Sequence, residues 1–174
     1  MVSKPSYKKR DESRGKSVSD YWPLFSLILI AALAGVALNW HAQGSFRDWM
    51  HYFMGFFLCC FAMFKIFNLS GFADGFQMYD IIAKDNRKYA LVYPFIELTL
   101  GLGYLSFIFP VLVYLATIII MLIGTIGVVK ALLKGLDINC PCMGSVLSVP
   151  LSTVTLTEDI GMSVMAFIMM AMIF

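Results

Sequence analysis

Five stretches of apolar residues, separated by short polar connectors, account for almost the whole chain after Asp20. Each is close in length to the roughly 20 residues that an α-helix needs to cross the hydrocarbon core of a bilayer. The pattern therefore predicts an all-α fold, a polytopic membrane bundle of about five transmembrane helices within residues 21–174. The predicted spans are 21–40, 50–67, 89–109, 111–133 and 155–174.

The first apolar segment is the one most easily mistaken for a secretory signal peptide. It is longer than the hydrophobic region of such a peptide, which has about 7–15 residues. It also has aromatic residues at both ends and lacks a small-x-small cleavage site before polar sequence. We therefore interpret residues 21–40 as an uncleaved anchor.

Composition and charge exclude an ordinary soluble domain and indicate an orientation. The chain is 60% hydrophobic and 14% charged, whereas soluble domains are about 45–50% apolar and about 25% charged. Residues 1–20 form a polar, basic tail that we expect to be disordered. If this tail is cytoplasmic, 12 of the 13 Lys and Arg residues lie on one side and only Arg47 lies outside. The positive-inside rule thus predicts a cytoplasmic N-terminus in a bacterial inner membrane, and the tail is interpreted as a topology signal rather than as a nucleic-acid site.

Two connectors carry helix signals of their own. Phe72, Phe76, Tyr79 and Ile82 follow helical spacing and predict a short amphipathic helix on the membrane interface. The last segment begins with Thr155 and has Glu158 three residues later, which is a capping-box pattern. Glu158 and Asp159 also suit the positive end of a helix dipole, so we interpret both as structural. His41 and His51 are expected at the outer interface as ordinary polar residues.

Four cysteines occur as two close pairs, Cys59-Cys60 in the second span and Cys140-Pro141-Cys142 in the last connector. The thiolate form of cysteine is both a nucleophile and a ligand for soft metals. Pro141 disfavours helix at Cys140, so the second pair lies in a bend that can present both sulfur atoms on one side.

Glu97 lies in the middle of the third span, where a charge costs roughly 2.5–3.5 kcal/mol on insertion scales. It should therefore face the bundle interior, and Lys65 is its expected partner. Counting about 1.5 Å per residue along each helix places Cys59 and Glu97 at a similar depth.

Part of the chain resembles the DoxX/MauE group of membrane proteins. The resemblance rests on MGFFLCCFAMFKIFNLSGFADGFQMYDIIA, YALVYPFIELTLGLGYL and INCPCMGSV, within roughly residues 50–150. It implies a four-helix core, here with an extra N-terminal span, and a redox-associated protein of methylamine utilisation that forms disulfides in, or matures, a periplasmic dehydrogenase subunit. Cys140 and Cys142 would be the redox pair and Glu97 a proton acceptor or charge partner. Cys59 and Cys60 would form a relay, and the partner would be a thiol-bearing protein.

An alternative function uses the same four cysteines as metal ligands. The layout of Cys59, Cys60, Cys140 and Cys142 is similar to that of mercury importers of the MerT type. Soft thiolates select ions such as Cu(I) and Hg(II), so copper or mercury would be the bound ion. A third hypothesis is a scaffold subunit without chemistry of its own, and whether the protein is an enzyme stays open.

Overall fold

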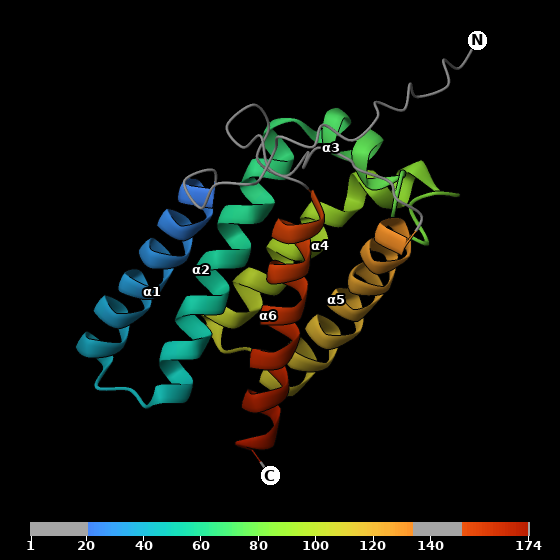
Figure 1. Cartoon of the computed structure of the whole chain (residues 1–174). Coiled ribbons are helices and arrows are strands. Elements are labelled where there is room, and N and C mark those ends of the chain that lie inside the picture. Colours follow the sequence, from blue (N-terminus) through green and yellow to red (C-terminus); the bar gives the residue numbers. More distant parts are fainter. Residues whose placement is uncertain (1–20, 134–150, 174) are drawn as a thin grey trace.

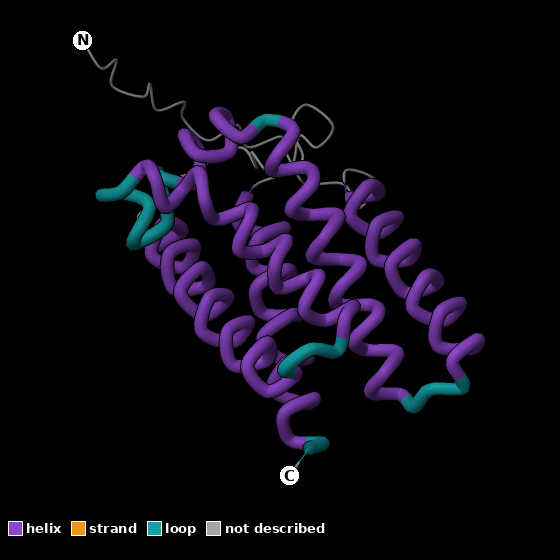
Figure 2. Tube along the Cα trace, turned by 180° about the vertical axis from the view of Figure 1, so that it is seen from behind, coloured by secondary structure: helices purple, strands orange, loops and turns teal. Residues whose placement is uncertain are grey.

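The described residues of the computed structural model, 21–133 and 151–173, form six α-helices (Figure 1). Side chains in the second range are described from residue 154 onward. The helices are α1 (Trp22–Ala42), α2 (Phe46–Phe67), α3 (Leu69–Phe76), α4 (Arg87–Ser106), α5 (Pro110–Leu133) and α6 (Leu151–Ala171). Figure 2 shows the same arrangement from behind, and the described residues in it are helices joined by loops. The predicted all-α class is confirmed.

Local sequence signals set the helix ends. Pro23 lies in the first turn of α1, where its missing N–H costs no hydrogen bond. Ser45 and Asp48 form a capping box at the start of α2, in which each side chain accepts from the other residue's backbone N–H. Asn86 caps α4 by accepting from the N–H groups of Lys88 and Tyr89.

Four of these helices are long and apolar enough to cross a membrane, so this is a multi-pass membrane protein. They are Trp22–Ala42, Phe46–Phe67, Pro110–Leu133 and Val154–Ala171. Helix α4, which contains most of the predicted span 89–109, is not among the four candidates. Its apolar run is interrupted by Pro94, Glu97 and several tyrosines.

Helix α2 is the centre of the packing. It lies against α1 on one side and α4 on the other, while α5 and α6 pack closely against each other. Contacts between α4 and α5 and between α2 and α6 join these two groups. In Figure 1 the α1–α2 and α4–α5 connections lie at the same end as the C-terminus, and α3 lies at the opposite end. We call these the C-terminal end and the α3 end of the bundle.

Two helix limits differ from those that the sequence predicts. The amphipathic helix expected over residues 72–83 is α3, which already ends at Phe76 and is followed by turns over 77–86. Asp80 accepts hydrogen bonds from the N–H groups of Ile82 and Ala83, and this local bonding closes a turn in place of a further helical turn. Helix α6 begins at Leu151, so Thr155 and Glu158 lie inside the helix and not at its N-cap.

Candidate functional site: a buried ionic cluster

Lys65, near the end of α2, extends into the bundle interior and is only 3% exposed. Its Nζ donates to both carboxylate oxygens of Glu97 in α4, each at 2.7 Å. It also donates to Oε1 of Glu158 in α6, at 3.2 Å. The predicted Lys65–Glu97 pair is confirmed, and three helices that are distant in sequence meet at one ammonium group.

Aromatic rings surround this ammonium group. The ring centres of Phe61, Phe72 and Tyr93 lie 5.5, 5.7 and 5.4 Å from Nζ of Lys65. The negative faces of such rings attract a cation. The rings also keep the surroundings apolar, so the interaction of Lys65 with the carboxylates is poorly screened.

Asp159 follows Glu158 in α6 and is equally buried, with 2% of its surface exposed. Because neighbouring residues of a helix point about 100° apart, the two side chains face different helices. A Cβ atom placed on Gly124 of α5 would lie 2.6 Å from Oδ2 of Asp159, so Gly124 leaves the space that this carboxyl group occupies. We call Lys65, Glu97, Glu158 and Asp159 the Lys65 cluster.

The sequence did not predict the role of Glu158 and Asp159 in this cluster. Their position three and four residues after Thr155 matched a helix start, and that interpretation was wrong because α6 begins a turn earlier. Their burial is the observation that separates them from ordinary helix-start acids. A usable signal was present, because both acids lie within a predicted membrane span.

Cys59 lies on the face of α2 that meets α4. A Cβ atom placed on Gly101 would be 2.8 Å from Sγ of Cys59 and 3.0 Å from its backbone nitrogen. Gly101 is one helical turn beyond Glu97, and Cys59 is within electrostatic reach of that carboxylate. Both Cys59 and Cys60 are free thiols, each partly buried.

A second buried polar group lies toward the C-terminal end of the bundle. His51 of α2 is 2% exposed, so it packs between the helices, and its predicted depth at the outer interface stays a prediction. Its Nδ1 lies 3.1 Å from the carbonyl oxygen of Tyr104 and its Nε2 lies 2.5 Å from the hydroxyl of Tyr114. The carbonyl only accepts, so Nδ1 carries the proton and Nε2 accepts from Tyr114. Tyr104 in turn donates to Thr117 at 3.1 Å. We call these four residues the His51 network.

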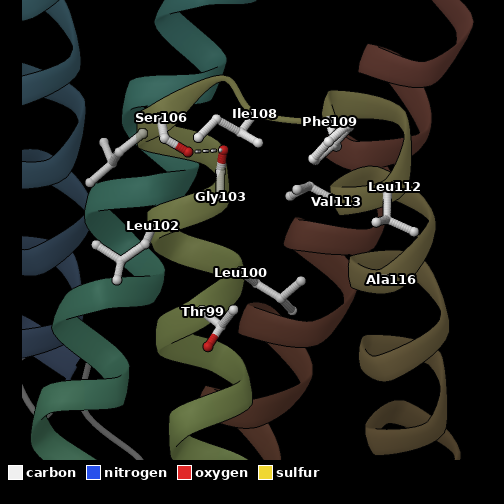
Figure 3. A pocket seen from close by; sticks show the side chains of 11 residues that line it. Thr99, Leu100, Leu102, Gly103, Ser106, Ile108, Phe109, Leu112, Val113 and Ala116 are labelled. Atoms are coloured by element: carbon white, nitrogen blue, oxygen red, sulfur yellow. Dashed lines mark hydrogen bonds between the residues drawn. The ribbon is translucent and has the colours of Figure 1, made fainter.

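An apolar groove of about 660 Å³ opens between α4 and α5 (Figure 3). Its two hydroxyl groups already donate to the chain's own backbone, Thr99 to the carbonyl of Phe95 and Ser106 to that of Gly103. The groove therefore offers few polar groups that would orient a ligand, and we do not assign it as the functional site.

The predicted pair Cys140 and Cys142 lies outside the described residues. In the part of the chain that the structure describes, no group of three or more His, Cys, Asp or Glu side chains has the arrangement of a metal site. The predicted copper or mercury site therefore stays a hypothesis that rests on the sequence alone.

Comparison with known proteins identifies the family of the chain. Searches of the curated proteins and of the solved structures found no similar protein. The family model for the methylamine utilisation protein MauE matches residues 43–172. That range covers more than half of the chain and includes helices α2 to α6. The chain therefore belongs to the MauE family of methylamine utilisation proteins.

Proposed function

We propose that this MauE-family membrane protein carries out thiol–disulfide exchange with a partner protein, with Cys140 and Cys142 as the exchanging pair. Two thiols one residue apart are suited to successive attack and release. Family membership supports a role in methylamine utilisation. The assignment of Cys140 and Cys142 rests on the sequence, since both residues lie outside the described part of the chain.

The position of Cys59 is the structural observation that bears on the proposed relay. Its sulfur lies at the α2–α4 interface against Gly101, one turn from the buried Glu97. Cys60 is the next residue of the same helix, and its side chain points about 100° away. The two neighbours therefore diverge, so a relay would use Cys59 and Cys60 singly with thiols from elsewhere.

The exchange step can be written with its electrons balanced. A thiolate of the Cys140–Cys142 pair attacks a disulfide of the partner, forms a mixed disulfide and displaces one partner thiolate. The second thiol of the pair, after losing its proton, attacks the mixed disulfide and releases the other partner thiolate. The partner gains two electrons and, after protonation, two thiols, while Cys140 and Cys142 become a disulfide.

We further propose that α4 is the fifth membrane span and that the N-terminus is cytoplasmic. Helix α4 runs between α2 and α5 from the α3 end to the C-terminal end of the bundle, as the membrane helices do (Figure 1). Arg87, Lys88 and Lys130 belong to the α3 end, and α1, which follows the basic tail in the sequence, begins at that same end. The positive-inside rule then favours a cytoplasmic α3 end.

Trapping of a mixed disulfide tests the exchange reaction. We expect Cys140→Ser or Cys142→Ser to accumulate a disulfide-linked partner, because the remaining thiol attacks and cannot be displaced. The wild-type protein, which keeps both thiols of the pair, is the control and should trap nothing. If the protein keeps its function after replacement of all four cysteines, and no partner is trapped, the proposal is wrong. If the cysteines stay reduced and react with a maleimide only after a chelator is added, the metal-binding alternative would replace the proposal.

Labelling in intact cells tests the orientation. A membrane-impermeant maleimide should leave Cys140 and Cys142 unmodified, because both follow α5 on the side assigned to the cytoplasm. A permeant maleimide should modify both in cells treated beforehand with a reductant. Modification by the impermeant reagent would invert the assigned orientation.

A further inference from the structure

The Lys65 cluster contains more acidic groups than basic ones. Lys65 pairs with Glu97 and Glu158 and is within electrostatic reach of Asp159, and each of the four residues is at most 3% exposed. With every group ionised, the cluster would hold two uncompensated negative charges inside a membrane bundle. Burying an unpaired carboxylate is so costly that such a group normally binds a proton instead.

The hydrogen bonds indicate where the excess charge would lie. Glu97 uses both oxygens to accept from Lys65, so its ionised form is well paired. Oε2 of Glu158 and Oδ2 of Asp159 are buried and have no hydrogen-bond partner in the described part of the chain. Thr155, one turn before Asp159 on α6, also has a buried hydroxyl oxygen without a partner there.

Two of the carboxyl groups are close enough to share a proton. Glu97 and Glu158 accept from the same Nζ of Lys65, at 2.7 and 3.2 Å, so their carboxyl groups lie side by side. Since two carboxylates only accept hydrogen bonds, a bond between them requires one proton. Two carboxyl groups that share a site in this way are a known arrangement for holding a proton at neutral pH.

We infer that the Lys65 cluster is a proton-binding site, in which Glu158 shares one proton with Glu97 and Asp159 holds a second. With these two protons bound, the charges of Lys65 and Glu97 balance and the cluster is neutral. The bound ligand is H⁺ and not a metal ion, in agreement with the absence of a metal-binding group of side chains among the described residues.

A further buried acid lies between the cluster and the α3 end. Asp80, in the turns after α3, is 1% exposed, and its Oδ2 likewise has no partner among the described residues. It is within electrostatic reach of Asp159. Asp80, Asp159 and Glu158 therefore form a series of buried carboxyl groups that extends from the α3 end into the interior.

Other titratable groups face this series from the neighbouring helices. Tyr93 of α4 interacts with all four residues of the cluster, and Cys59 of α2 interacts with Glu97. Helix α5 contributes Gly124 at Asp159 and Gly127 at Asp80, neither of which carries a charge. Lys65 is the cation that interacts with Glu97, Asp159 and Tyr93 in the described part of the chain.

Infrared difference spectroscopy of the full-length protein in lipid nanodiscs tests the inference. At neutral pH the protein should show the carbonyl band of protonated carboxylic acids, and this band should shift in D₂O. Glu158→Gln and Asp159→Asn should each lower the intensity of this band by the contribution of one carboxyl group. Asp74→Asn is the control, because Asp74 is an exposed acid paired with Arg87, and it should leave the band unchanged.

Each alternative outcome overturns the inference. Absence of the acid band from the wild-type protein would show that all carboxyl groups are ionised, and that result needs no variant to fold. A band that disappears when Na⁺ or K⁺ is added at fixed pH would identify a metal-cation site instead. The inference does not depend on the thiol chemistry, so a variant with all four cysteines replaced by alanine should keep the band.

Discussion

Helix α2 carries a buried polar group toward each of its ends, and the two differ in how completely they are satisfied. In the His51 network each ring nitrogen has one partner, and the hydroxyl groups of Tyr104 and Thr117 are hydrogen-bonded. The network is neutral with its donors and acceptors matched. In the Lys65 cluster, by contrast, one base pairs with two acids, a third buried acid lies within electrostatic reach, and two acid oxygens lack a partner among the described residues.

The difference separates a structural group from a functional one. A matched neutral network fixes how α2, α4 and α5 pack, and it has nothing further to bind. A cluster with surplus acidic groups is costly in a membrane unless it binds a ligand, and buried ionisable residues within membrane helices are functional candidates for that reason. The predictions below test this comparison, beginning with the largest expected effect.

Removal of the base should have the largest effect. Lys65→Met should destabilise the protein by about 3–5 kcal/mol, because it leaves the ionised Glu97 buried without its cation. Lys130→Met is the control, since Lys130 is exposed on α5, and it should change stability by no more than about 0.5 kcal/mol. Thermal unfolding in nanodiscs measures both. Equal stabilities of the two variants would contradict a cluster organised around Lys65.

Crowding of the α2–α4 interface between the two polar groups should have a smaller effect. Gly101→Ala should cost about 1–3 kcal/mol, since overpacking forces backbone to move, and the new Cβ would lie 3.0 Å from the backbone nitrogen of Cys59. Gly161→Ala is the control, because a Cβ at Gly161 would have no neighbour within 4 Å. It should leave the protein as stable or more stable, as alanine favours helix. The same unfolding assay distinguishes them.

Loss of one hydrogen bond from the His51 network should cost less again. Tyr104→Phe removes the bond to Thr117, whose hydroxyl still donates to the carbonyl of Val113. The expected destabilisation is about 0.5–1.5 kcal/mol, the net value of one hydrogen bond. Tyr52→Phe, at a half-buried tyrosine of α2, should be nearly neutral. A loss several times larger in Tyr104→Phe would mean that the network does more than fix packing.

Asp80 should give the smallest effect, visible as a dependence on pH. Burial raises the pKa of Asp80, and hydrogen bonds from the N–H groups of Ala83 and Ile82 oppose that rise. The folded state therefore binds the proton more tightly than the unfolded state does. Its contribution to stability is fully present below the unfolded pKa and is lost as pH rises through the folded pKa. Asp80→Asn should remove that decline, and unfolding measured over a pH series would contradict the account if both proteins declined equally.

The helices and the Lys65–Glu97 pair could be predicted because they depend on quantities that a sequence contains. Apolar length indicates a span, and an isolated charge within a span calls for a partner. The place of Glu158, Asp159 and His51 depends instead on which helix faces meet, and hydropathy does not contain that information. Thr155 and Glu158 also have the spacing of a capping box. That spacing led to the wrong interpretation of Glu158 and Asp159 as residues of a helix start. The roles of Cys140 and Cys142 stay predictions.

The stability of one double variant, Glu158→Gln with Asp159→Asn, tests the central claim most directly. If both acids are held protonated, the two amides replace neutral groups of the same shape and leave the Lys65–Glu97 pair intact. The thermal unfolding temperature at neutral pH should then equal or exceed that of the wild-type protein. A loss as large as that expected for Lys65→Met would show that Glu158 and Asp159 are ionised partners of a cation, and it would contradict the account.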